Sequence, residues 1–302
     1  LVQGILVSAT NGTYEQPSTV TIDGLDASSF DQPGGGISNV PQTGVYVYTN
    51  GSVTTADVQD VTITNSSISG TENTTSDYAG IICGDFSGAI GSTIQDITIS
   101  GTTVASNLNR GIYVRGQNTI ANLSDVVFTE NGANPTGAGG NDGFHLVVRN
   151  NAEVDVSNSV FTNPASQTSD EFDGLSLQTG STLTISNSSF NQNGNGTIAS
   201  TSGIDLSGNY LGSTDETDLT SWINSGCDFT PYLGSATDSD LGTDGFQGDF
   251  GNLYVTNEGA QTGSADRVQE AHDLANAGGA VSLNMGDYAE ALVVTKNLTM
   301  SP

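Results

Sequence analysis

The sequence predicts an all-β fold, a right-handed parallel β-helix with a short capping α-helix near the C-terminus. The first reason is a glycine followed by alternating apolar residues, which recurs at intervals of 36, 31, 32, 31 and 29 residues. Repeats of this length are typical of solenoids. The second reason is the period-two alternation itself, which indicates strands with one face inward and one outward. The repeats open at Gly44, Gly80, Gly111, Gly143, Gly174 and Gly203.

A second repeated run supports the same period. Its copies are VQDVTI from Val58, IQDITI from Ile94, LSDVVF from Leu123, VSNSVF from Val156 and ISNSSF from Ile185. Corresponding strands of successive coils would pair in parallel, about 4.8 Å apart.

The alternation assigns a facing to each residue of the first strand. We expect an inward column of Val45, Ile81, Ile112, Phe144, Leu175 and Ile204, and an outward, solvated column of Tyr46, Ile82, Tyr113, His145, Ser176 and Asp205. Phe144 should therefore be core and His145 surface. Arg115 and Arg149 fall on different positions of their repeats.

In chain order, residues 1–233 should form β-helix coils, beginning with strands at Gly4 to Val7 and near Val20. Residues 234–251 are rich in Gly and Asp and resemble a linker. From Ser264, which can act as an N-cap, to Gly278 an apolar stripe predicts the capping helix. Residues 280–300 then add further strands. Residues 252–302 thus have the order of elements expected at the beginning of another β-helix.

Composition limits the partners. The formal net charge is −28, with 33 acidic and five basic side chains, so nucleic acid is not an expected partner. No apolar run is long enough to cross a membrane. The acidic, Gly-, Asn-, Ser- and Thr-rich sequence is typical of secreted or cell-surface proteins. Cys83 and Cys227 lie too many coils apart to form a disulfide and should be buried free thiols.

The repeated runs resemble the pectin-lyase-like β-helix superfamily, in the form found in bacterial and marine surface proteins. Asn209-Tyr-Leu-Gly and the later Thr230-Pro-Tyr-Leu are similar to the end of such domains, with Leu211 where Trp is usual. The resemblance implies the fold across nearly the whole chain. It leaves the function open, because the superfamily includes lyases, glycosidases, phage tailspikes and adhesins.

Four acidic residues, Asp142, Asp170, Glu171 and Asp173, occur at one corner of adjacent coils. Carboxylates about one coil apart could bind Ca²⁺ or, as an acid and a base, cleave glycosidic bonds. Asp-Gly is equally an ordinary turn sequence. Calcium is therefore an expected cofactor only if this corner is a metal site.

The sequence favours a structural role over an enzymatic one. His145 with Arg115 and Arg149 could suggest a lyase, which needs a base beside a cation, but no signature of one is complete. A polysaccharide-active enzyme or a carbohydrate-binding, tailspike-like shaft remains the alternative. An ice-binding array on Thr21, Thr62 and Thr98 is disfavoured because later coils interrupt the threonines.

The favoured hypothesis is a structural or adhesive unit that associates head to tail, as a filament or as tandem repeats of one fibre. A first coil without a cap leaves backbone groups that another strand can pair with. We expect residues 252–302 of one unit to stack on residues 1–25 of the next. The residues expected at this contact are Gly4, Ile5, Val7, Val281, Leu283, Leu292, Val294 and Leu298.

Overall fold

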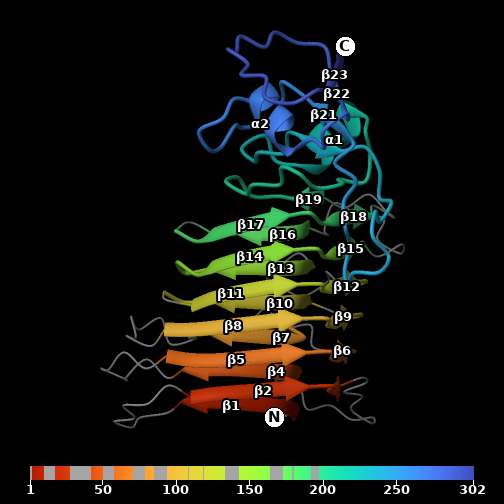
Figure 1. The fold of residues 1–302 in the computed structure, drawn as a ribbon. Coiled ribbons are helices and arrows are strands. Elements are labelled where there is room, and N and C mark those ends of the chain that lie inside the picture. Colours follow the sequence, from red (N-terminus) through yellow and green to blue (C-terminus); the bar gives the residue numbers. More distant parts are fainter. Residues whose placement is uncertain are drawn as a thin grey trace.

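The computed structural model describes residues 2–9, 18–27, 42–49, 58–70, 79–84, 94–107, 109–117, 119–132, 143–163, 173–178, 180–191 and 197–302. Three parallel sheets run along the stack, with the N-terminus at one end and the C-terminus at the other (Figure 1). The expected parallel β-helix is confirmed, and the architecture fits a right-handed solenoid.

Each of the first six coils contributes one strand to each of the three sheets, and a seventh strand, β19, extends the first sheet. The first sheet contains β1 (Val2–Ala9), β4 (Gln42–Thr49), β7 (Ile81–Gly84), β10 (Arg110–Arg115), β13 (Phe144–Arg149), β16 (Asp173–Leu177) and β19 (Thr197–Ala199). The second contains β2 (Ser18–Asp23), β5 (Val58–Thr64), β8 (Ile94–Ser100), β11 (Thr119–Ser124), β14 (Glu153–Ser157) and β17 (Thr182–Ser186). The third contains β3 (Asp26–Ala27), β6 (Ser67–Ser69), β9 (Thr103–Ala105), β12 (Val127–Thr129), β15 (Val160–Thr162) and β18 (Ser189–Asn191).

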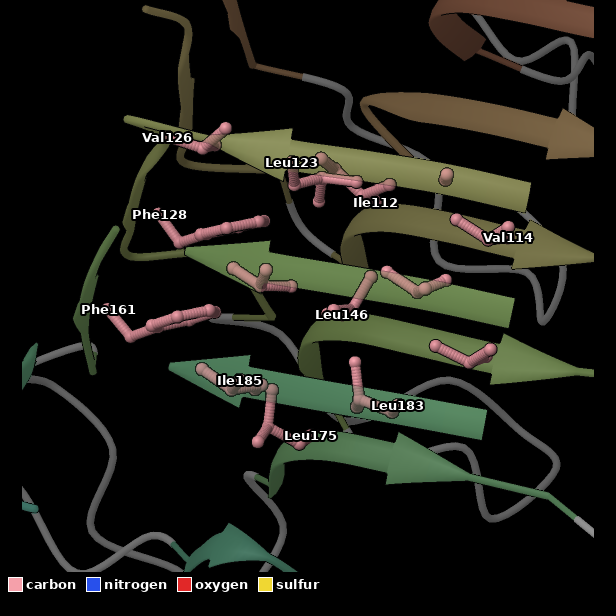
Figure 2. Packing of buried hydrophobic residues seen from close by; sticks show 14 of the residues in the cluster. Ile112, Val114, Leu123, Val126, Phe128, Leu146, Phe161, Leu175, Leu183 and Ile185 are labelled. Atoms are coloured by element: carbon pink, nitrogen blue, oxygen red, sulfur yellow. The ribbon is translucent and has the colours of Figure 1, made fainter. Parts of the chain in front are cut away.

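The core lies between the sheets as columns of stacked apolar side chains (Figure 2). Ile112, Leu146 and Leu175 occupy one such column and are register partners on successive strands. In the third sheet Phe128, Phe161 and Phe190 stack with ring centroids 4.5 Å apart at each step. Burial of these side chains is the main stabilising contribution to the solenoid.

The corner between the second and third sheets turns with one residue in the left-handed region. Asn65, Asp125, Asn158 and Asn187 occupy it with φ between 48° and 56°. Asn and Asp tolerate this conformation better than other non-glycine residues. The next residue in several coils is a buried Ser or Thr, whose hydroxyl donates to the carbonyl two residues earlier and accepts an N–H from the neighbouring coil. These bonds satisfy backbone groups that the corner would otherwise leave unpaired.

Two sequence alignments require correction. LSDVVF does not align with IQDITI, because Leu123 pairs with Ile99 and the run from Leu123 crosses the corner between the second and third sheets. The marker Gly143 is displaced by two residues, since Phe144 pairs with Arg110 and Leu146 pairs with Ile112.

Two side chains just before Leu146 also depart from the alternation of the strand, which places Leu146 and Val148 in the coil core. Phe144 lies outside the coil core, in a cluster with Ala79, Ile82, Tyr113 and Val147. His145 is fully buried against the rings of Phe128 and Phe161. The assignments of Phe144 to the core and of His145 to the surface were therefore wrong. Three other members of the expected outward column are also buried, since Ile82, Tyr113 and Ser176 are 2%, 1% and 6% exposed.

The stack continues beyond β19 through isolated parallel bridges, such as Thr184 to Asp205 and Asp205 to Asp228. A four-stranded sheet follows, in the order β20 (Tyr232–Leu233), β21 (Asn252–Val255), β22 (Ala280–Leu283) and β23 (Thr299–Ser301). Two helices accompany it, α1 (Glu216–Trp222) and α2 (Arg267–Leu274). The capping helix begins later than expected, with Asp266 and not Ser264 at its N-cap.

Residues 234–251 run back along the side of the coils. Phe246 is buried, and its N–H donates to the carbonyl of Asn158 at 2.8 Å. Asn187 accepts from the N–H of Gly248 at 2.7 Å. We call residues 234–251 the strap. Cys83 and Cys227 are both buried free thiols, as expected.

Candidate functional site

The N-terminal end of the stack is formed by the edge strands β1, β2 and β3. Each pairs with only one other strand among those described, namely β4, β5 and β6. The apolar columns lose their cover here. Ile5 and Val7 of β1 are partly buried, whereas Val45 and Val47 on the next strand are 0% exposed. Gly4 directly precedes Ile5 on β1.

The C-terminal end is formed by β22, β23 and the segment between them. We call residues 252–302 the cap. Val281 is buried in the hydrophobic cluster of the cap, and Leu283, Leu292 and Leu298 are partly buried against this cluster. Val294 is 67% exposed. The structure therefore brings the five predicted C-terminal contact residues to one end, although only Val294 is largely free for contact.

Sequence reasoning missed three more apolar side chains at this end. Met285 is 98% exposed, Val293 64% and Met300 37%. A hollow of about 500 Å³ is lined by Leu283, Met285, Tyr288 and Met300, among others. Within β21, β22 and β23, Leu253, Val281 and Met300 are register partners, so Met300 ends a column whose inner members are fully buried. We use the name end face for five apolar residues of this end that are not fully buried and lie on β22, β23 or the segment between them, namely Leu283, Met285, Val293, Val294 and Met300.

The cap is joined to its own last coils. β20 pairs antiparallel with β21, and the rings of Tyr232 and Tyr254 stack 5.6 Å apart. Thr262 donates to Asp228 Oδ2 through both its N–H, at 2.6 Å, and its hydroxyl, at 3.0 Å. Residues 252–302 thus cover the C-terminal coils of their own unit, and their β23 edge points away from it (Figure 1).

Carboxylates gather where the cap meets the last coil. Burial raises the pKa of Asp228 and of Glu270. Repulsion by Asp205 adds to the shift of both carboxyl groups, and repulsion by Asp228 adds to that of Glu270. Nevertheless, within the described ranges no group of three or more His, Cys, Asp or Glu side chains is arranged to hold a metal ion.

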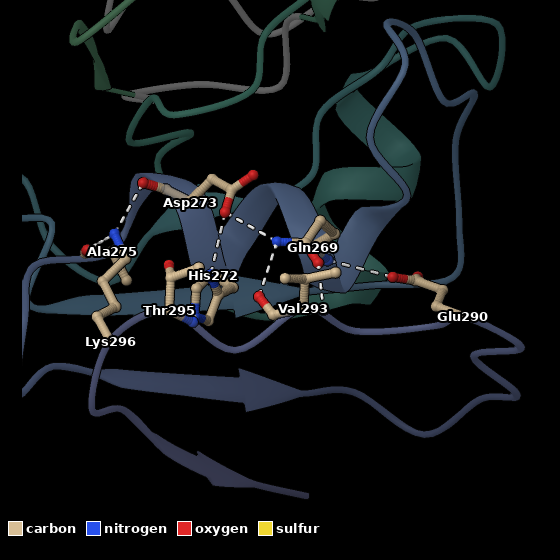
Figure 3. Close-up of polar contacts among 8 residues, drawn as sticks. All are labelled: Gln269, His272, Asp273, Ala275, Glu290, Val293, Thr295 and Lys296. Carbon is tan, nitrogen blue, oxygen red and sulfur yellow. Dashed lines mark hydrogen bonds and ion pairs between the residues drawn. The ribbon is translucent and has the colours of Figure 1, made fainter.

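Within the cap, residues 290–297 are held along α2 by side-chain hydrogen bonds (Figure 3). Glu290 accepts from the N–H groups of Val268 and Gln269 at the helix N-terminus, at 2.9 and 3.2 Å. His272 Nε2 accepts from the N–H of Thr295 at 3.1 Å. Lys296 Nζ donates to the carbonyls of Asp273 and Ala275 at the helix C-terminus. An acid at the N-terminus and a base at the C-terminus both complement the helix dipole. We call residues 290–297 the clip.

A cationic cluster lies on the outer face of the first sheet. The guanidinium carbons of Arg110, Arg115 and Arg149 lie 4.8, 5.7 and 5.6 Å from the ring centroid of Tyr113. Arg115 and Arg149 are register partners on β10 and β13, which corrects the expectation that their positions differ. Three of the five basic side chains of the chain thus surround one tyrosine. Such contacts are stabilising cation–π interactions.

The expected calcium corner lies largely outside the described residues. Asp142, Asp170 and Glu171 are not among them, and for Asp173 only its backbone position in β16 is described. The hypothesis of a calcium site at this corner stays a prediction.

Comparisons with protein-family models, curated proteins and solved structures find no match for this chain. The parallel β-helix therefore rests on the chain's own sheets. Neither helix in the described part of the chain is long and apolar enough to cross a membrane.

Proposed function

We propose that the chain is an extracellular structural or adhesive β-helix unit of the pectin-lyase-like type, which associates end to end with a second copy of itself. The end face of one copy would contact the first coil, residues 1–25, of the next. The two surfaces differ, so the contact is heterologous and extends into a filament.

The observation that supports this proposal best is the concentration of apolar surface beside an open strand edge. Of the seven large hydrophobic side chains that are exposed in the described part of the chain, four lie between residues 285 and 300. Exposed apolar patches of this kind commonly mark interaction sites. An edge strand can be extended by strand addition, in which backbone hydrogen bonds supply affinity and side chains supply register.

The first coil, which would be the partner surface of the end face, also combines partly exposed apolar side chains with an open strand edge. At the first coil Ile5, Val7 and Val20 are only partly buried, and the backbone of β1 pairs on one side alone among the described strands. Met300 at one end and Ile5 at the other both terminate inward-facing columns. Stacking the two ends would continue these columns and remove both surfaces from water.

The test is a charge placed in the end face. Met300→Asp should lower the fraction of oligomer measured by light scattering at least tenfold, because a carboxylate would be buried against apolar side chains. Leu241→Asp is the matched control, since Leu241 is 90% exposed but lies in the strap. Monomeric wild-type protein at high concentration and moderate salt would contradict the proposal, as would equal effects of the two substitutions.

Calcium is proposed as a ligand of the corner containing Asp142, Asp170, Glu171 and Asp173. Removing divalent cations at constant ionic strength should then lower the melting temperature, because a bound ion stabilises only the folded state. The variant Asp142→Asn, Asp170→Asn should melt at the same temperature with and without chelator. A chelator effect of the same size in this variant would exclude the corner.

Carbohydrate binding is the second candidate function. The observation that favours it is the cationic cluster of Arg110, Arg115 and Arg149 around Tyr113. Guanidinium groups bind carboxylates and sulfates with two parallel hydrogen bonds. The variant Arg115→Gln, Arg149→Gln should weaken any binding of an acidic polysaccharide without changing end-to-end association. Retained polysaccharide binding by this variant would exclude the cluster.

A further inference from the structure

We propose that His272 makes the end face sensitive to pH, because protonation of its ring releases the clip from α2. The release of the clip is a property of the single chain. Only its consequence, weaker end-to-end association in mild acid, rests on the proposed function.

The clip depends on side chains for its position. Residues 285–296 make no backbone-to-backbone hydrogen bond within the fully described stretch 197–302. Gln269 accepts from the N–H of Val293 at 2.7 Å, and the contacts of Glu290, His272 and Lys296 complete the attachment. The clip carries Val293 and Val294 and leads directly into β23. Its attachment therefore fixes two of the five residues of the end face and the edge strand beside them.

The hydrogen bonds of His272 define its tautomer. The Thr295 group bonded to Nε2 is the backbone N–H, which can only donate, so Nε2 must be the unprotonated ring nitrogen that accepts from it. The ring proton is then on Nδ1, which lies 3.0 Å from Asp273 Oδ1. The imidazole is 0% exposed, and water cannot easily replace either partner.

A second proton would act on one of these two bonds only. It would occupy Nε2, so that two donors, Nε2–H and the Thr295 N–H, face each other. The bond to Asp273 would become charge-assisted and remain, because both residues belong to α2. Protonation thus keeps His272 on the helix and detaches the clip.

Charged side chains near His272 act on the neutral and the protonated form of its ring in different ways. Asp273 favours the imidazolium, and its own pKa is lowered chiefly by the hydrogen bond from His272 and then by that from Gln269. Lys296, which also lies near Asp273, opposes it. Glu290 binds the first turn of α2, about one turn from His272. Of the side chains that hold the clip, His272 alone is a histidine, the residue type that most often acts as a proton switch in proteins.

The test is amide hydrogen exchange in the full chain at about pH 7.5 and about pH 5, with rates corrected for the intrinsic effect of pH. Protection of the Thr295 amide and its neighbours should fall about tenfold in acid, as expected for the loss of a hydrogen bond to a buried group. The control is His272→Gln, whose side-chain oxygen can accept from Thr295 but does not titrate. Its protection should be independent of pH. Amides of β21 report whether the rest of the cap stays folded.

Three results would overturn the inference: unchanged protection in the wild type, the same loss in His272→Gln, or an equal loss in β21, which would mean general unfolding of the cap. Light scattering on the same samples examines association separately. Clip release without any association at either pH would contradict the proposed function and leave this inference intact.

Discussion

At the residue scale, the corner of the first sheet shows how a repeated glycine can mislead. Gly80 and Gly111 lie where a Cβ would meet the side-chain amides of Asn107 and Asn131, 2.7 and 3.0 Å away. The glycines leave room for these amides. In the next coil the equivalent corner residue is His145, which pairs opposite Gly111, and Gly143 lies two residues earlier. Because a shift of two residues preserves a period-two pattern, the sequence could predict the strand but not its register.

His145 shows what this corner requires. Its ring contacts Phe128 and Phe161 and is hydrogen-bonded to Asn131 and Asn163. His145→Ala should therefore destabilise the fold by about 2–4 kcal/mol, as expected for a buried ring. The sequence pattern, which placed this residue on the surface, predicted almost no loss.

The same residue should make the fold sensitive to acid. Burial lowers the pKa of His145 to about 3, whereas an unfolded histidine titrates near 6.5. Because the folded pKa is depressed, this contribution to stability is complete above about pH 6.5 and is lost as the pH falls towards 3, by about 1.4 kcal/mol per unit.

The measurement is the free energy of unfolding in urea between about pH 7 and pH 4 for the wild type and for His145→Gln. The difference in the free energy of unfolding between the wild type and His145→Gln should change steadily as the pH falls, to the disadvantage of the wild type. A constant difference between the two proteins would show that His145 is not held neutral in the fold.

At the scale of elements, the long strands of the first two sheets were predictable because their apolar alternation is regular. The helix α1 was not, since Leu219 is its only buried residue and no apolar stripe forms. Its local signal is Asp215, which accepts from the N–H of Thr217 at 2.8 Å, followed by acids in the first turn. The start of α2 was misplaced because its first N–H groups are capped by Glu290, which is distant in the sequence.

The strap provides the prediction at this scale. Asn187 and Asn65 both occupy the left-handed corner position, with φ of 48° and 49°. Of the two, only Asn187 also holds the strap, because its side-chain oxygen accepts from the N–H of Gly248 while its amide donates to Asn158 in the neighbouring coil. Asn187→Ala should thus lower the free energy of unfolding by about 1–3 kcal/mol more than Asn65→Ala does. The Asn65→Ala variant only introduces backbone strain and loses an exposed hydrogen bond to Asp23.

Urea denaturation gives the two losses, and limited proteolysis locates them. Cleavage within residues 236–250 should become faster in Asn187→Ala and stay unchanged in Asn65→Ala. If both variants lose the same stability and the strap remains resistant, the strap is held by the burial of Phe246 alone.

At the scale of the whole molecule, the sequence predicted the solenoid and the apolar character of residues 281–298. It could not predict the end face, because the exposure of Met285 and Met300 depends on which strand is the last in the sheet. The net charge of −28 opposes association between identical copies. Association should therefore increase with salt, which screens this repulsion, while the apolar contact at the end face is retained.

The most direct measurement of end-to-end association is a disulfide formed across the proposed contact. Adjacent strands bring register partners about 5 Å apart, within the range that a disulfide requires. The native thiols, Cys83 and Cys227, are buried and should not interfere. The proposal predicts that mild oxidation of a mixture of Ile5→Cys and Met300→Cys proteins gives a disulfide-linked mixed dimer on a denaturing gel. The double variant should give a ladder of longer crosslinked oligomers, and each single variant alone should give no crosslink. Dimers formed by Met300→Cys alone, or no crosslink in the double variant at concentrations where scattering shows oligomers, would contradict it.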